Sequence, residues 1–151
     1  KYTSNNTRGD IYEILAEYGE INSEDSDLMY LTNVKSNIMF INKSKVNLTS
    51  NFANFNTRTF ETTFIDDVKI TKDDQIITGE KLYLVLDHDE SNSQNNAGKE
   101  QNLLRMSRNV VFEKPGYTLK ADILEIDLIT KNLKIYMNNK NNKVIATSLL
   151  K

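Results

Sequence analysis

Hydrophobic and polar residues alternate near the end of the chain, but the alternation shifts once. In "LKADILEIDLITKNLKIYM", residues 119–137, the apolar set runs through Leu119 and Ala121 and then continues from Leu124. Because successive side chains of a strand lie on opposite faces, one extra residue moves all later side chains to the other face. The shift predicts a strand that bends or bulges beside a small residue and so keeps one apolar face inward.

The same shift recurs three times earlier in the chain. The pattern around Gly79 aligns without a gap with the pattern around Ala121, which lies 42 residues later, and two further copies come before it. Each copy contains a small residue followed by an acid or amide, and the four small residues are Ala16, Ser50, Gly79 and Ala121. Their spacings are 34, 29 and 42 residues. If roughly ten loop residues are subtracted from the longest spacing, it also approaches thirty. The sequence therefore predicts an all-β fold of strand–corner–strand repeats of about thirty residues.

Other local signals agree with an array of strands. An amide or acid followed by valine opens three of the apolar runs, at Asn33-Val34, Asp67-Val68 and Asn109-Val110. Turn signals separate neighbouring runs at Asp73-Asp74, Pro115-Gly116 and Lys131-Asn132. We expect one domain over residues 1–151, with the polar segment 88–102 as a mobile loop.

Residues 10–19 fit two structures. Ile11, Ile14, Leu15 and Tyr18 have helical spacing, with Asp10 as an N-cap and Gly19 as a stop. The fourth copy of the repeat instead makes residues 11–21 a strand, with Tyr12, Ile14, Ala16, Gly19 and Ile21 inward. We favour the strand because it agrees with the other copies.

Composition narrows the chemistry. The net charge is −2 and no stretch is strongly basic, which argues against nucleic-acid binding. The chain has no cysteine and one histidine, so thiolate and multi-histidine metal sites are excluded. No G-x-S-x-G motif occurs. We therefore predict that the protein is not an enzyme and holds no cofactor or metal.

Each of two groups of acidic residues could be either a functional site or an ordinary part of the solvated surface. Asp122, Glu125 and Asp127 could act as paired carboxylates, but they alternate with inward leucines and so fall on the solvated face. The segment 87–90, "DHDE", could hold a hard cation, but it lacks the spacing and glycine of a calcium loop. We interpret both groups, and His88, as solvated surface.

The inward apolar residues form either an ordinary core or the lining of a binding trough. They are Val34, Ile38, Phe40, Phe55, Val68, Ile70, Leu82, Leu84, Leu86, Val110, Phe112, Leu124, Ile126 and Leu128. The last segment is apolar on both strand faces, which indicates either a buried last strand or an edge that docks a partner. Its apolar residues are Leu133, Ile135, Tyr136, Met137, Val144 and Ile145.

Several of these stretches resemble the LptC family, most closely its alphaproteobacterial members. They are "IYEILAEYGEI", "LTNVKSNIMF", "DDVKITKDDQIITGEKLYL" and "NVVFEKPGYTLKADILEIDLITKNLKIYM". The family belongs to the OstA-like superfamily that also contains LptA. The resemblance implies an open, V-shaped β-jellyroll of two antiparallel sheets in the periplasm. It also implies an inner-membrane anchor helix upstream of Lys1.

The function implied is lipopolysaccharide transport. A protein of this family accepts the lipid from the LptB, LptF and LptG transporter and passes it to LptA. The inward set would then bind lipid. The N-terminal edge, with Ile11, Tyr12 and Ile14, would meet LptF and LptG, and the C-terminal edge would meet an LptA-like jellyroll. Copies of the chain could also pair by their edges. The alternatives are a soluble LptA-like bridge protein and a structural β-solenoid that binds no lipid.

Overall fold

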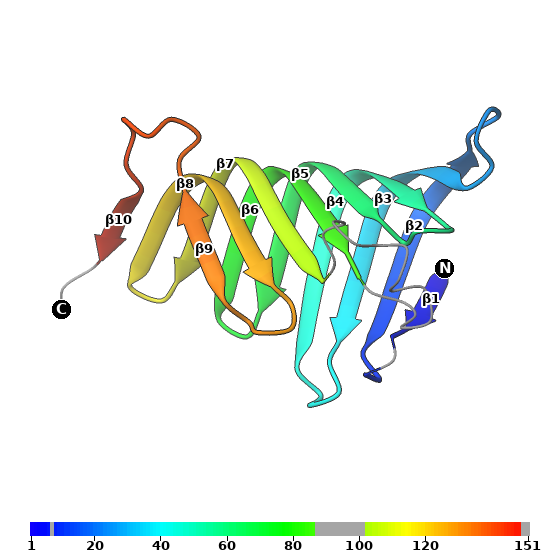
Figure 1. The fold of residues 1–151 in the computed structure, drawn as a ribbon, viewed down its shortest axis with the longest axis horizontal. Helices are drawn as coiled ribbons and strands as arrows, with labels where there is room; N and C mark the ends of the chain where they lie inside the picture. The colour runs from blue at the N-terminus through cyan, green and yellow to red at the C-terminus, as the bar shows by residue number, and fades with distance from the viewer. Residues whose placement is uncertain (7, 87–101, 149–151) are drawn as a thin grey trace, which may run out of the picture.

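The computed structural model describes residues 1–6, 8–86 and 102–148, so the segment 88–101 of the predicted loop lies outside the described residues. The described chain forms ten antiparallel strands in one sheet, drawn from blue to red in Figure 1. The first eight strands lie side by side in chain order. The last two strands, β9 and β10, both pair with the eighth strand, at different parts of its length. The strands are β1 (Tyr2–Asn5), β2 (Ile11–Ile21), β3 (Leu28–Met39), β4 (Lys45–Asn56), β5 (Thr62–Lys72), β6 (Gln75–Val85), β7 (Leu103–Lys114), β8 (Tyr117–Asp127), β9 (Leu133–Tyr136) and β10 (Ile145–Ser148).

The all-β prediction is confirmed, and residues 11–21 are a strand rather than a helix. The long strands cross a common crease that divides the sheet into two facing layers. The first layer contains residues 2–5, 11–16, 34–39, 45–50, 68–72, 75–79, 110–114, 117–121 and 145–148. The second layer contains residues 17–21, 28–33, 51–56, 62–67, 80–85, 103–109, 122–127 and 133–136.

The predicted corner residues lie at the crease. In β4, β6 and β8 the buried positions change parity there, for example from Ser50 to Ala53 in β4. The strands β5 and β7 cross it differently, because Asp66-Asp67 and Arg108-Asn109 both have positive φ and lie where the register shifts. Each pair is a two-residue bulge opposite one residue of a neighbouring strand.

Polar side chains connect neighbouring strands along the outside of the crease. Amide groups donate to carboxylates between β3 and β2, between β4 and β5, and between β7 and β6. The pairs are Asn33 with Glu17, Asn51 with Asp66 and Asn109 with Glu80. The acid or amide that follows the small residue is therefore part of the corner, because Glu17, Asn51 and Glu80 each bond to a residue of positive φ in the neighbouring strand. Asn and Asp, which tolerate positive φ, occupy those neighbouring positions.

We expect Asn109→Ala to lower the free energy of unfolding by about 1 kcal/mol, whereas Asn109→Gly changes it little. The φ of Asn109 is 52°, where a Cβ without a local hydrogen bond is unfavourable and glycine is free. Urea unfolding of the two variants measures the difference. Equal losses for Ala and Gly would mean that the side-chain bond to Glu80, rather than the backbone, sets the stability of the corner.

The core lies between the two layers. Leu82 and Leu124 are fully buried, as the repeat requires. At the N-terminal end the space is filled, because the Tyr2 ring of the first layer lies 4.8 Å from the Phe55 ring of the second. The hydroxyl of Tyr12 is 3.1 Å from that of Thr62 across the layers, and burial raises the pKa of Tyr12 to about 12. The layers are therefore joined firmly at this end.

Candidate functional site

The inward orientation of the predicted apolar set is confirmed, with eleven of its fourteen residues buried. The three that remain half-buried, Phe40, Phe112 and Ile126, all border one cavity. This cavity lies between the layers on the side away from the crease and has a volume of about 240 Å³. We call it the mouth cavity. The partial exposure of these three residues therefore marks where the space between the layers opens.

The mouth cavity is formed by strands of both layers and by the turns at their ends. Its apolar lining residues are Ile38, Phe40, Val46, Ile70, Ile77, Leu104, Phe112, Ile126, Leu128 and Leu133. Its polar lining residues are Asn42, Ser44, Lys72, Gln75 and Lys131. Seven of these fifteen residues belong to the sets predicted from the sequence for lipid binding or for a partner edge. Val46, Ile77 and Leu104 are apolar but belong to neither set, and the five polar residues lie in turns or at strand ends, where periodicity is a weak guide.

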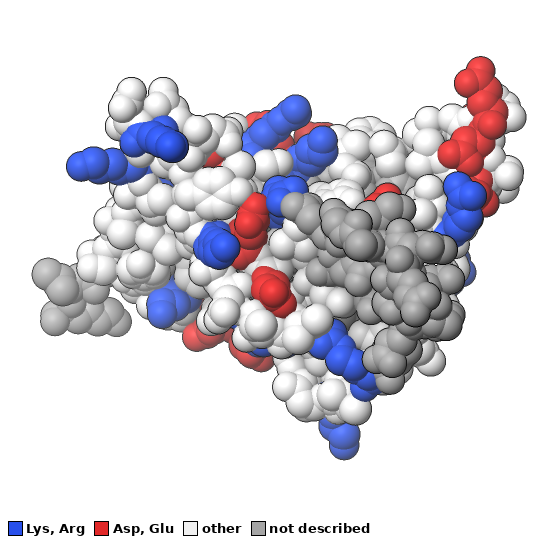
Figure 2. All heavy atoms as spheres, viewed as in Figure 1, with Lys and Arg blue, Asp and Glu red and all other residues white. Residues whose placement is uncertain are grey.

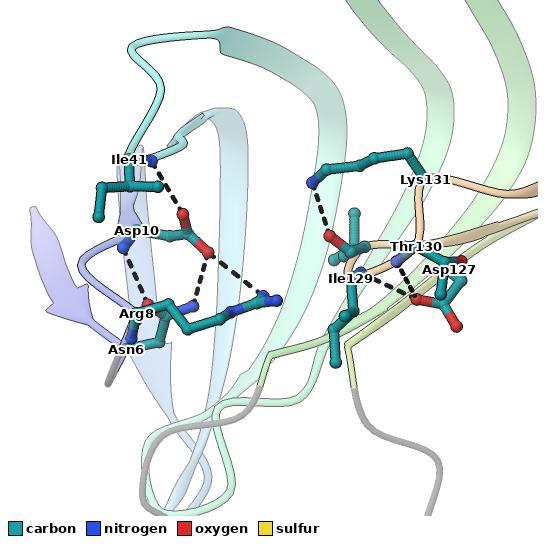
Figure 3. A network of polar contacts seen from close by, with 9 residues as sticks. Asn6, Arg8, Asp10, Ile41, Asp127, Ile129, Thr130 and Lys131 are labelled. Atoms are coloured by element: carbon teal, nitrogen blue, oxygen red, sulfur yellow. Dashed lines mark hydrogen bonds and ion pairs between the residues drawn. The ribbon is translucent and has the colours of Figure 1, made fainter.

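Three connections meet beside this cavity (Figure 3). Asp10, just before β2, accepts hydrogen bonds from Asn6 Nδ2 at 2.8 Å and from the backbone N–H of Ile41 at 3.0 Å. Arg8 forms an ion pair with the same carboxylate at 3.3 Å. These contacts attach the β1–β2 connection to the β3–β4 turn, so that the carboxylate of Asp10 is neutralised and its oxygens are occupied.

The β8–β9 turn faces this group. Asp127 Oδ1 accepts from the backbone N–H groups of Ile129 and Thr130, and these bonds lower the pKa of Asp127. Lys131, with a positive φ of 63°, directs its ammonium group to the carbonyl of Leu128 at 2.6 Å. The same ammonium lies 3.4 Å from the centre of the Phe40 ring, which belongs to the other layer's turn. Lys131 therefore bridges the open side of the two-layer structure.

Burial of its ammonium lowers the pKa of Lys131, although the nearby charge of Asp10 acts in the opposite direction. A cation that is partly removed from water at the border of an apolar cavity is attracted by any anion that can reach it.

The two ends of the sheet differ in the hydrogen bonding of their edges. At the N-terminal end, β1 pairs only with residues 11–14 of β2. Residues 15–21 pair with β3 on one side, and on their outer side no strand of the described residues pairs with them. Tyr18 and Ile21 are 61% and 60% exposed there. Tyr12 and Ile14, predicted to lie at a partner edge, are instead buried beneath β1, and only Ile11 of the three is exposed.

At the C-terminal end two short strands cover β8. β9 pairs with residues 123–126 of β8 and β10 with residues 117–120. The interpretation of this segment as a buried last strand is wrong, because Leu133, Tyr136 and Ile145 are exposed and all four residues of β10 are exposed. Ile135, Met137 and Val144 are half-buried. A four-residue strand cannot hide large side chains on both faces.

The two ends also carry opposite charge (Figure 2). Residues 17–27, at the N-terminal end, contain five acidic residues and no basic residue. Residues 131–143, at the C-terminal end, contain four lysines and no acidic residue. Asp27 is paired with Arg58, so not all of the acidic charge is free.

The carboxylates considered as acid–base candidates all have structural partners. Glu125 accepts a hydrogen bond from the Tyr136 hydroxyl and forms an ion pair with Arg105 at 2.9 Å, and these two interactions, the first above all, lower the pKa of Glu125. Asp122 accepts from the backbone N–H of Asn138. The "DHDE" segment, including His88, lies outside the described residues. Among the residues that are described, no three metal-ligating side chains gather.

The described part of the chain contains no helix that is long and apolar enough to span a membrane.

Comparison with solved structures identifies the fold. The structure is similar to the crystal structure of LptH, the LptA homologous periplasmic component of the conserved lipopolysaccharide transport device from Pseudomonas aeruginosa. The TM-score is 0.59 at 8% sequence identity, over 92% of this chain and 95% of that chain. No family model and no curated protein sequence matches. The protein thus has the open β-jellyroll fold of LptA-like proteins.

Proposed function

We propose that this protein carries lipopolysaccharide across the periplasm, in the role of LptC. It would accept the lipid from the inner-membrane LptB, LptF and LptG transporter and pass it to an LptA-like jellyroll. The observation that carries this proposal is the mouth cavity, an apolar space open between two layers of the same fold as a transport component. The proposal assigns no catalytic activity to the chain.

The cavity suits a lipid in transit. Each methylene that moves from water into an apolar lining contributes about 0.8 kcal/mol. A closed barrel would retain its ligand, whereas a cavity that is open on one side lets the sugars of the ligand remain in water. The half-buried Phe40, Phe112 and Ile126 are the lining residues that we expect an acyl chain to contact first.

The edges suit docking in a defined direction. An unpaired strand edge binds another strand through its backbone groups. We expect residues 15–21 of β2 to meet the LptF and LptG side, and β9 and β10 to meet the LptA-like partner. Opposite charges at the two ends favour one orientation, because like-charged edges repel each other. Copies of this chain could pair in the same way.

A soluble bridge protein is the second candidate, and the similarity to an LptA homologue favours it. The start of the full-length gene product distinguishes the two roles. An uncleaved apolar helix supports the LptC role and a cleavable signal peptide supports the soluble bridge. The remaining alternative, a structural solenoid without lipid, predicts a filled interior, and the mouth cavity counts against it.

Site-specific photo-cross-linking tests the transport role. A photoreactive residue at Phe112 or Ile126 should capture lipopolysaccharide in cells that are exporting it. The matched control is the same residue at Lys35, which lies on the outer face of β3 and should capture none. Equal capture at Lys35, or none at either lining position during active export, would refute the proposal.

A further inference from the structure

The charged residues of the mouth cavity are all of one sign. Among the described residues that line it, ten are apolar and five polar, and the only charged side chains are those of Lys72 and Lys131. Lys72 ends β5 in the first layer, and Lys131 lies in the β8–β9 turn that follows the second layer. Two cations from different layers therefore border one apolar space that has no acidic residue in its described lining.

Neither lysine has a carboxylate partner within 4.0 Å in the described part of the chain. The nearest relevant acids are already engaged, Asp10 by Arg8, Asn6 and the Ile41 N–H, and Asp127 by two backbone N–H groups. Within residues 1–6, 8–86 and 102–148, the ammonium of Lys131 contacts a carbonyl oxygen and the face of an aromatic ring and no anionic oxygen within 4.0 Å. Both are weaker partners for a cation than an anionic oxygen.

We propose that Lys72 and Lys131 form a subsite for the anionic head group of an amphiphile whose tail occupies the mouth cavity. The head group, a phosphate or a carboxylate, takes the place of the Leu128 carbonyl and the Phe40 ring as the partner of Lys131. Release of the Phe40 ring also frees the border of the cavity for the tail. The inference rests on the proposed function only in that the cavity receives acyl chains.

Binding of three small probes tests the subsite. The probes are dodecyl phosphate and dodecyl maltoside, both below their micellar concentrations, and inorganic phosphate, each titrated calorimetrically into the intact chain. We expect dodecyl phosphate to bind about tenfold more tightly than dodecyl maltoside, because only the phosphate carries a negative charge that the two lysines attract. Inorganic phosphate alone should bind far more weakly than either amphiphile.

The variants separate charge from packing. Lys131→Gln and Lys72→Gln should each reduce the preference for dodecyl phosphate to about threefold, and the double variant should abolish it. Lys131→Arg should retain the preference because it keeps the cation. Lys35→Gln, on the outer face, is the matched control and should change nothing. Thermal melting of each variant confirms that the fold is intact.

The outcomes distinguish this inference from the proposed function. If neither amphiphile binds, the cavity does not take acyl chains and the proposed function fails with the subsite. If both bind equally and Lys131→Gln has no effect, the subsite is refuted while the cavity stands. If inorganic phosphate binds as tightly as dodecyl phosphate, the lysines form a simple anion site and the proposed amphiphile is wrong.

Discussion

Gly79→Val should lower the free energy of unfolding by about 2–4 kcal/mol, the upper range for an overpacked core position. A Cβ at Gly79 would lie 2.7 Å from Met106 Cγ and 2.8 Å from its Sδ, and Met106 is fully buried. Valine is otherwise preferred over glycine in strands, so in a position without this contact the substitution would stabilise the sheet. Thermal unfolding should show a fall in the melting temperature of roughly 6–12 °C.

Gly19→Val is the matched control for this prediction. Gly19 lies in β2 and is exposed, and a Cβ there would come within 3.2 Å only of the flexible Leu31 Cδ2. We expect a loss well under that of Gly79→Val. A double variant, Gly79→Val with Met106→Ala, should be more stable than the sum of the single losses predicts, because each change relieves the other. Additive losses would mean that Met106 is not the obstacle at the crease.

The corner was predictable in the strands that carry a small residue. At Ser50, Gly79 and Ala121 the parity of the apolar pattern changes within a single strand, and this change is visible in the sequence. The way in which β5 and β7 cross the crease was not predicted. In β5 and β7 two consecutive residues of positive φ cross the crease and leave the apolar parity unchanged. In the sequence, Asp67-Val68 and Asn109-Val110 predict the start of an apolar run, whereas in the structure they lie where β5 and β7 cross the crease.

Residues 11–21 show how pairing between strands decides an ambiguous local pattern. The helical spacing of Ile11, Ile14 and Leu15 is real, but in the structure ten residues of β2 pair with β3. Tyr12 and Ile14 are then buried on one face, as the repeat predicts. The exposure of residues 17–21 could not be predicted, because it depends on how short β1 is and therefore on which part of β2 it covers.

The site could be predicted only in part. The inward orientation of the apolar residues follows from alternation, and six of the ten apolar residues that line the mouth cavity belong to the inward set predicted from the sequence. Which of them border an opening depends on the gap between two layers that are distant in sequence, as with Phe40 and Leu133. Lys72 is the last residue of β5 and Lys131 lies in the β8–β9 turn, and at a strand end or in a turn the periodic pattern does not mark the direction of a side chain. Their common location is a result of the crease, which brings the β5–β6 and β8–β9 turns to the same side.

Opposite charge at the two ends leads to a prediction about self-association. We expect the chain to associate end to end at low ionic strength, and two double variants to weaken this by about ten- to hundredfold. One is Glu20→Lys with Glu24→Lys at the N-terminal end, and the other is Lys134→Glu with Lys140→Glu at the C-terminal end. Each removes attractions of about 0.2–1 kcal/mol per pair and adds repulsions of similar size. Sedimentation velocity measures the association.

Mixing the two double variants provides the decisive comparison. The first variant changes the formal charge of residues 17–27 from −5 to −1, and the second changes that of residues 131–143 from +4 to 0. Each variant alone therefore loses most of the attraction between its own two ends. In the mixture, an end of one variant meets an oppositely charged end of the other, and association should return to near the level of the unmodified chain. It should weaken again as salt rises above about 0.15 M, where the screening length is about 8 Å. If the mixture stays as weakly associated as either variant alone, complementary charge does not direct docking between the two edges. The exposed apolar side chains of β2 and β10 would then have to provide the specificity by themselves.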